Sequence, residues 1–303
     1  MKLRIGYLMS GIVTGLLILL AFIWTQPDGK LHVVFCNVGQ GDASYVRLPD
    51  GRDMLIDGGP DDRVLTCLGR HMPFWDRHID MVVLSHPQKD HMAGLVSVLN
   101  RFDVSYVFKS DVANTSEEYK QFMGAIQKRH IPVKLLTQGD RITIGPTSLL
   151  VLWPTSAQIA KAHGVGLTNV LGAASTDEPA SVIATLNDYC VVFELHYRTF
   201  DVIYPGDADS RVEPRYTGLP LADNEVEVLK VPHHGSKTGL TKDFIEWIHP
   251  KLAVISVGNN SYGQPAKEII TILQNIGSQV LRTDKAGDIE VVSDGDHWNI
   301  LHS

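Results

Sequence analysis

Ser85-His86-Pro87-Gln88-Lys89-Asp90-His91 is the stretch that decides the fold. It ends the short apolar run 80–85, which is typical of a strand buried on both faces. Two histidines and an aspartate in the turn after such a strand indicate a metal site, because imidazole nitrogen and carboxylate oxygen together suit zinc or manganese. One turn cannot enclose an ion, so further ligands are expected from the ends of other strands.

Three other clusters follow strand-like runs and offer such ligands. Asp57 ends an apolar strand and precedes a glycine pair, and Asp207 closes the turn Pro205-Gly206-Asp207. The third cluster contains His233 and His234, again after an apolar run. Taken alone, each cluster fits an ordinary structural role at least as well as metal binding. An aspartate after a strand often caps a turn, and a histidine pair is often solvated on the surface. Together with the first stretch they favour one shared metal site.

The segments around these clusters predict a single domain of strands and helices. Their order suits two sheets packed face to face between outer helices. Residues 154–180 are rich in Ala, Gly, Ser and Thr and predict a long loop. The expected strands are 31–35, 43–48, 52–56, 80–85, 133–136, 141–144, 148–152, 181–186, 190–196, 201–204, 226–231, 252–257, 279–282 and 288–292, and the expected helices are 92–102, 116–130 and 266–275.

Composition excludes several classes of protein. The 303 residues are 44% hydrophobic and 20% charged, unlike a disordered chain, a collagen-like fibre or a disulfide scaffold. The net charge of −7 excludes a general nucleic-acid coat, although nucleic acid can still be a substrate held by a local patch or by metal.

The three cysteines, Cys36, Cys67 and Cys190, contain no C-x-x-C pair, which disfavours a structural zinc knuckle. An oxidising compartment would permit at most one disulfide and leave one thiol. The alternative for Cys36 and Cys190, which lie in strand-like runs, is buried packing.

The amino-terminal segment predicts a membrane anchor. Residues 5–25 carry no charge and are long enough to cross a bilayer as a helix, so the lipid bilayer is the expected partner of this segment. Lys2 and Arg4 precede the run and place the rest of the chain outside the cytoplasm. The predicted division is therefore 1–27 as anchor or signal segment and 28–303 as the folded domain. A cleaved signal with a secreted domain, or a buried helix, remains the alternative.

Seven segments in order resemble the metallo-β-lactamase superfamily, and within it the soluble domain of the ComEC-type competence proteins. The resemblance implies an α+β fold, a four-layer αββα sandwich with a metal site at one edge of the sheets. ComEC-type proteins carry many membrane helices, whereas this chain has one span at most, so a stand-alone domain is expected. The segments are Asn37–Ala43, Leu55–Gly59, Ser85–His91 with Gly94, Pro205–Asp207, Val231–Thr238, Ser256–Gly263 and Arg282–Ile289.

The resemblance also implies roles for individual residues and one or two divalent ions, zinc or manganese, as cofactors. Asp207 would bridge toward a second metal, which His86 would serve, and Asp57 would orient ligands. Asp90 and His233 are the residues implied in catalysis, His233 by steadying a phosphate oxygen or protonating a leaving group. The implied metal ligands are His86, Asp90, His91, Asp207 and His234.

Three positions depart from the family pattern. Gln88 stands where the pattern has His or Asp, Cys190 aligns with a ligand position, and Gln264-Pro265 replaces His-Pro. The second metal position is therefore expected to be degraded, with Gln88 and Cys190 as weak candidates for it, and the first to be complete.

Three functions remain open. The first is a metal-dependent phosphodiesterase or nuclease that uses metal-activated water on a nucleic-acid substrate. The second is a hydrolase of a small ester or phosphoester. The third is a binding module that keeps the fold without turnover, for which Gln88 and Gln264 argue. No protein partner is indicated.

Overall fold

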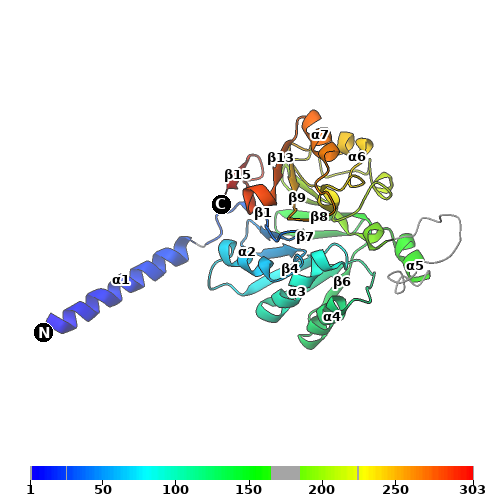
Figure 1. The fold of residues 1–303 in the computed structure, drawn as a ribbon. Helices are drawn as coiled ribbons and strands as arrows, with labels where there is room; N and C mark the ends of the chain where they lie inside the picture. The colour runs from blue at the N-terminus through cyan, green and yellow to red at the C-terminus, as the bar shows by residue number, and fades with distance from the viewer. Residues whose placement is uncertain (1, 25, 165–184, 224, 303) are drawn as a thin grey trace, which may run out of the picture.

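Two β-sheets pack face to face, with helices on both outer faces (Figure 1). The computed structural model describes residues 2–24, 26–164, 185–223 and 225–302. The helices are α1 (Lys2–Trp24), α2 (Arg63–His71), α3 (Lys89–Arg101), α4 (Glu117–Lys128), α5 (Ser156–Gly164), α6 (Lys242–Ile248), α7 (Lys267–Asn275) and α8 (Thr283–Ala286), with short 3₁₀ turns at Leu186–Tyr189, Glu213–Arg215 and Pro232–Gly235. The α+β sandwich expected from the sequence is confirmed.

The first sheet contains eight strands in the order β15-β14-β1-β2-β3-β4-β5-β6. From β3 to β6 the neighbours run parallel, and the other pairs are antiparallel. Helices α2, α3 and α4 cover its outer face. The strands are β1 (Leu31–Phe35), β2 (Ser44–Arg47), β3 (Asp53–Ile56), β4 (His78–Leu84), β5 (Asp103–Lys109), β6 (Val133–Leu135), β14 (Ile289–Ser293) and β15 (Trp298–His302).

The second sheet contains seven strands in the order β13-β12-β11-β10-β9-β8-β7. Neighbours from β10 to β13 run parallel, and those from β7 to β10 are antiparallel. Helices α6 and α7 cover its outer face. The strands are β7 (Arg141–Ile144), β8 (Thr147–Trp153), β9 (Val192–Tyr197), β10 (Phe200–Tyr204), β11 (Val228–Lys230), β12 (Leu252–Ile255) and β13 (Gln279–Arg282).

Alternation along the strands divides the apolar residues between three layers. Val33 and Phe35 of β1 point into the core between the sheets, whereas Val34 and Cys36 point to the helices outside. A fully buried aliphatic or aromatic side chain stabilises the fold by about 1.5–3 kcal/mol. A shift of one residue in register would exchange the two faces, so this pattern fixes how each strand pairs.

A disulfide joins Cys36, at the end of β1, to Cys67 in α2, with a Cα–Cα distance of 5.8 Å. It ties the first sheet to the helix that covers it. Cys36 is therefore a disulfide partner rather than a packing residue, and Cys190 is the buried free thiol.

One expectation about local structure needs correction, and another falls mostly outside the described residues. Residues Ser156–Gly164 form helix α5, whereas the sequence predicted one loop over 154–180. Its mixture of small and polar residues lacks strong helical periodicity, and packing of Ile159 and Ala162 beside Val112 and Tyr189 supports the helix. Residues 165–184, which include the rest of that loop and most of the strand expected at 181–186, lie outside the described residues.

Helix α1 extends away from the two-sheet body (Figure 1). Within the described residues, no helix combines the length and the apolar character that crossing a membrane requires. The transmembrane helix expected at 5–25 is therefore not supported. Helix α1 also includes the charged residues Lys2 and Arg4, and position 25 falls outside the described residues.

Candidate metal centre

The ends of four strands meet at one edge of the sandwich. Parallel strands β3 and β4 lead to Asp57 and to the stretch 85–91. Parallel strands β10 and β11 of the other sheet lead to Asp207 and to the histidine pair 233–234. The Val191 amide donates to the Ser85 carbonyl oxygen at 2.8 Å and links the two edges. The topology thus brings together the four clusters that lie far apart in the sequence.

Helix α3 carries Asp90 and His91 into this edge because it packs very closely on the turn after β3. A Cβ atom on Gly94 would lie 2.0 Å from the Gly58 carbonyl oxygen, so no other residue fits at position 94. The Gly58 amide in turn donates to the His91 carbonyl oxygen at 2.6 Å. The glycine pair and Gly94 therefore set the depth of both side chains.

His91 is fully buried and is oriented by Asp57. Its Nδ1 atom lies 2.8 Å from Asp57 Oδ2, and its Nε2 atom lies 3.2 Å from Asp207 Oδ1. Asp57 is itself fixed, since it accepts hydrogen bonds from the Ser85 amide at 2.8 Å and from the Ser85 hydroxyl at 2.7 Å. Burial lowers the pKa of His91, but Asp207, Asp57 and Asp42 outweigh it and raise this pKa well above its usual value.

His234 faces the same point from the second sheet. Its Nδ1 atom lies 2.9 Å from the Ser256 carbonyl oxygen, which leaves Nε2 directed at Asp90 Oδ2, 3.3 Å away, and at Asp207 Oδ2, 3.6 Å away. His233 and His234 both have left-handed backbone, with φ of 50° and 53°. That conformation costs about 1–3 kcal/mol per residue and is typical of functional sites. Here it turns the two rings in different directions.

His86 lies beside His91 with ring centroids 4.2 Å apart. Burial and the His91 charge lower the pKa of His86 to about 4, so its ring is neutral and keeps a lone pair. In the described residues, the buried atoms His86 Nε2, His91 Nε2 and Asp207 Oδ1 have no hydrogen-bond partner. Buried polar atoms rarely lack a hydrogen-bond partner in folded proteins. Imidazole nitrogen and carboxylate oxygen are also the atoms that bind zinc and manganese. The residues present therefore fit a divalent ion.

Two of the weak candidates are occupied elsewhere. The Gln88 side-chain amide donates to Asn187 Oδ1 rather than turning to the histidines. The Cys190 sulfur accepts a hydrogen bond from the Asp207 amide at 3.3 Å, and burial raises the pKa of its thiol well above the usual value. Cys190 is thus a neutral thiol that positions Asp207 through its backbone amide. The side chains left for the second metal position are His86 and Asp207.

Asp42 and Lys230 were assigned no role from the sequence, and both are buried in this site. The Lys230 ammonium contacts Asp42 Oδ2 and lies 4.0 Å from Asp207 Oδ1. The only signal for Asp42 is its place at the end of Gly39-Gln40-Gly41-Asp42, and Lys230 begins the stretch that leads to the histidine pair.

Asp42, His91, Asp207 and His234 present ligand atoms within 4.8 Å of one another. Asp42, however, lies 3.5 Å from His234 Nδ1 and 3.6 Å from His91 Nδ1, the nitrogens already bound to other groups. An ion on the Nε2 side would therefore meet Asp90 and Asp207, with Asp42 behind the rings. This geometry favours the four-residue set Asp90, His91, Asp207 and His234.

A cavity of about 670 Å³ opens above these atoms. Gln264 lines it and links two of its walls, accepting from the Gln40 side-chain amide at 2.7 Å and donating to the His233 carbonyl oxygen at 3.1 Å. The Tyr262 side chain, 77% exposed, stands at the rim. The lining residues are Gln40, Pro60, Gln88, Lys89, Asp90, Asp207, His233, His234, Asn259, Asn260, Ser261, Tyr262 and Gln264.

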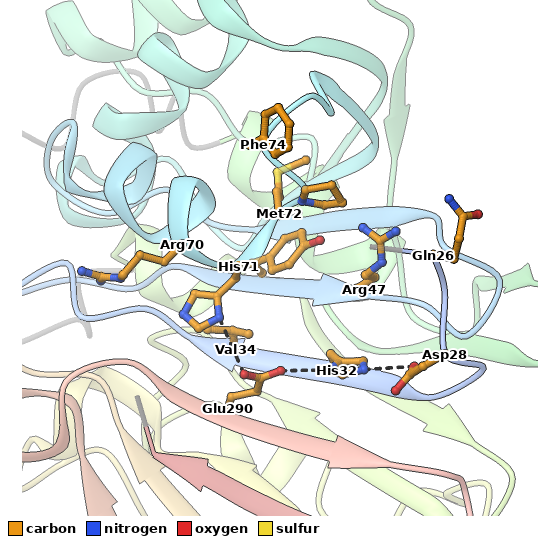
Figure 2. A pocket seen from close by; sticks show the side chains of 12 residues that line it. Gln26, Asp28, His32, Val34, Arg47, Arg70, His71, Met72, Phe74 and Glu290 are labelled. Carbon is orange, nitrogen blue, oxygen red and sulfur yellow. Dashed lines mark hydrogen bonds and ion pairs between the residues drawn. The ribbon is translucent and has the colours of Figure 1, made fainter. Parts of the chain in front are cut away.

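A second cavity, of about 400 Å³, lies between the amino-terminal half of β1 and the end of α2 (Figure 2). His32 bonds to Glu290 at 2.8 Å and to Asp28 at 3.1 Å, and His71 Nδ1 lies 3.7 Å from Glu290. These side chains pair with one another, in contrast to His86 Nε2 at the metal centre, which has no hydrogen-bond partner among the described residues.

The model of the metallo-beta-lactamase superfamily matches residues 36–258, which contain the four clusters that meet at the metal centre. The chain belongs to the metallo-β-lactamase superfamily. The resemblance drawn from the sequence motifs is thereby confirmed, including its link to competence proteins. ComE operon protein 3 of Bacillus subtilis is 25% identical over 291 residues, covering 89% of this chain and 34% of that protein.

Recombination protein 2 of Haemophilus influenzae is 24% identical over 260 residues, covering 84% of this chain and 28% of that protein. The chain thus spans about a third of the length of the curated relatives it matches. Among solved structures, the metallo-β-lactamase fold protein YhfI of Bacillus subtilis is 14% identical with a TM-score of 0.50, covering 86% of this chain and 99% of that one. At that identity the likeness shows the fold alone.

Proposed function

We propose that this protein is a metal-dependent hydrolase of phosphodiesters, with single-stranded nucleic acid as the first substrate to test. The observation that carries the proposal is the convergence of the ligand groups Asp90, His91, Asp207 and His234, all of which except His91 line the 670 Å³ cavity. The buried Nε2 atom of His86 lies beside them and has no hydrogen-bond partner among the described residues. A divalent ion bound in such a site supplies a water of lowered pKa and stabilises negative charge on the substrate. Kinship with competence proteins supports nucleic acid as the substrate class.

One metal position has its full set of ligands in this proposal. Asp90, His91, His234 and Asp207 would hold that ion, and His86 with Asp207 would offer a weaker second position. The turn of Gln88 toward Asn187 supports unequal affinities. We expect one tightly held divalent ion per chain, zinc or manganese, with a second bound only at high metal concentration.

His233 is placed to act on substrate directly. Its ring lines the cavity, and its Nε2 atom lies 4.0 Å from Asp207 Oδ2. From there it can donate a hydrogen bond to a phosphate oxygen or give a proton to the leaving oxygen. Gln264 holds the His233 backbone, so it acts as a positioning residue where the family pattern has a histidine.

The exposed Tyr262 ring supports nucleic acid over a compact phosphoester. Stacking of a base on an aromatic side chain contributes about 1–3 kcal/mol and tolerates any sequence. We expect Tyr262→Ala to weaken cleavage of single-stranded DNA at least fivefold, mainly through KM, and to leave a small aryl phosphodiester unaffected. Tyr106→Ala, on the exposed side of β5, is the matched control. Equal loss with both substrates would argue for the small-ester alternative, which a cavity of about 670 Å³ also fits.

Asp207→Asn tests the reaction itself. The full-length chain is stripped of metal, reloaded with manganese or zinc, and assayed on single-stranded DNA and on the aryl phosphodiester. We expect the variant to lose at least a hundredfold in kcat/KM, because the ion loses a charged ligand. His297→Asn, a change in a side chain that is 85% exposed, is the control. A folded, metal-loaded wild-type chain without turnover on either substrate would favour the binding-module alternative.

The Cys36–Cys67 disulfide supports a location outside the cytoplasm, since disulfides persist in oxidising compartments. Thiol alkylation of the chain taken from its native cells tests this. Under denaturing conditions only Cys190 should react, and three reactive thiols would contradict the proposal.

A further inference from the structure

A second cluster of ligand-type side chains lies far from the metal centre, on the outer face of the seven-stranded sheet. His196 of β9 and Asp201 of β10 are cross-strand partners, and His196 Nδ1 lies 2.7 Å from Asp201 Oδ1. Asp223 joins them from the loop that precedes β11. Asp201 is near the amino end of β10 and Asp207 lies in the turn past its carboxyl end, so the two sites lie at opposite ends of this strand.

The cluster is unusually rich in negative charge for its depth. Glu194 and Glu227 flank Asp201, and Glu227 Oε2 accepts the Asp201 amide at 2.8 Å. Lys251 is engaged with Glu225 at 2.6 Å and with Glu227 at 3.0 Å. Among the described residues, Lys251 pairs with Glu227 and the Arg141 charge acts on Glu194, so these cations compensate the flanking glutamates rather than Asp201.

Asp201 is fully buried, and among the described residues its Oδ2 atom has no hydrogen-bond partner. The carboxyl group of Asp223 lies within hydrogen-bonding reach of Asp201. Two carboxylates in such contact repel each other unless a proton or a cation lies between them. Burial and the charges of Glu194, Asp223 and Glu227 raise the pKa of Asp201 to about 9, so a further negative charge here is unfavourable without a compensating proton or cation.

We propose that His196, Asp201 and Asp223 form a second cation site, which binds a divalent transition-metal ion such as Zn²⁺ or Mn²⁺. Their ligand atoms all lie within 4.8 Å of one another, and one imidazole nitrogen with two carboxylates is a donor set that these ions favour. The ion would tie the β9–β10 hairpin to the loop before β11. The ion would stabilise the fold at this place, and it would lie outside the substrate cavity.

The test separates this site from the metal centre by disabling the latter. In a full-length Asp207→Asn/His234→Gln background, metal-stripped protein is titrated with ZnCl₂ or MnCl₂ by calorimetry and by thermal unfolding. One binding event per chain should remain, and Tm should rise by about 5 °C when the ion is present at 100 times its Kd. Adding His196→Gln or Asp223→Asn should abolish both the binding event and the Tm shift.

Two controls make the result decisive. Asp223 is half-buried in a loop, so Asp223→Asn is expected to fold even if a change inside the sheet does not, as checked by circular dichroism. Glu225→Gln changes a neighbouring exposed charge outside the ligand set and should leave the titration unaltered. No binding event in the double variant, or one that persists when Asp223 is changed, would overturn the proposal and leave a shared proton as the link between Asp201 and Asp223.

Discussion

Strand β10 has a buried aspartate near each end, and the two are stabilised in opposite ways. Asp207, past the carboxyl end, is surrounded by His91, His234 and Lys230. Burial by itself raises the pKa of Asp207, but the two histidines and the lysine outweigh it and hold this pKa well below its usual value. The carboxylate is therefore charged and ready to bind a cation.

Asp201, at the amino end, is surrounded mainly by acids, and its pKa is raised to about 9. In the metal-free chain, two aspartates of similar burial at the two ends of β10 are thus ionised at one end and protonated at the other. The difference teaches that burial alone does not decide the state of a carboxyl group. The charges that neighbouring strands and loops bring to it decide the outcome.

Removing the Lys230 side chain, the buried cation beside Asp207, should lower the free energy of unfolding more than any other change proposed here. Lys230→Met leaves Asp42 and Asp207 without their lysine partner, and breaking a buried ion pair costs about 3–5 kcal/mol. We expect the free energy of unfolding in urea to fall by that amount in metal-free protein. Lys237→Met, at a side chain that is 74% exposed, should change it by less than about 0.5 kcal/mol. Similar losses in both variants would show that Lys230 does not compensate the buried acids.

Disturbing the residue that orients His91 should have an intermediate effect. Asp57→Asn keeps the shape but weakens the hold on His91 Nδ1, and changes to such supporting residues cost about 10–100-fold in metal affinity or activity. The measurement is the metal Kd of the full chain together with its kcat/KM. Asp53→Asn, at the other end of β3 and bonded to the Tyr45 hydroxyl, is the matched control and should leave both values unchanged.

The smallest effect, at most ~1.4 kcal/mol for each pH unit, should come from a buried acid away from both sites. Burial raises the pKa of Glu213 to about 8, and its Oε2 atom accepts the Thr241 amide at 2.6 Å. The folded state therefore holds a proton that the unfolded chain releases near pH 4, so stability falls as pH rises from about 4 to about 8.

Glu213→Gln keeps the accepting oxygen and removes this proton. We expect the variant to gain stability relative to the wild type as pH rises from 5 to 8, by at most ~1.4 kcal/mol per pH unit. Urea unfolding at several pH values measures it, with the exposed Glu117→Gln as control. A difference between variant and wild type that stays constant over this range would contradict the raised pKa.

The sequence predicted most of the fold because strand patterns are local. The predictions at 31–35, 141–144 and 279–282 coincide with β1, β7 and β13. Strand β5 at Asp103–Lys109 was not predicted, although its residues alternate in burial, because it follows helix α3 without a turn signal. Helix α2 was also missed, and its tie to the sheet through Cys67 comes from tertiary contact.

The site was predictable to the extent that ligand types cluster after strands. Asp90, His91, Asp207 and His234 do converge, as the motifs indicated. Asp42 and Lys230 were not recognised because their partners lie across the two sheets, and nothing local distinguishes a buried lysine from a surface one. Gln88 and Cys190 were singled out from the sequence as departures from the family pattern, and only their contacts with Asn187 and Asp207 say what they do.

By itself, the sequence determined the superfamily, most of the strands, and the residue types gathered for a metal. Those properties depend on local pattern and on motifs in order along the chain. Only the tertiary structure decided which nitrogen of His91 and His234 is open, which acids are ionised, and that His196, Asp201 and Asp223 meet. These properties depend on distances between segments far apart in the chain. The energy of a charge interaction increases as the two groups approach and as they are buried away from water, and only the folded structure fixes both.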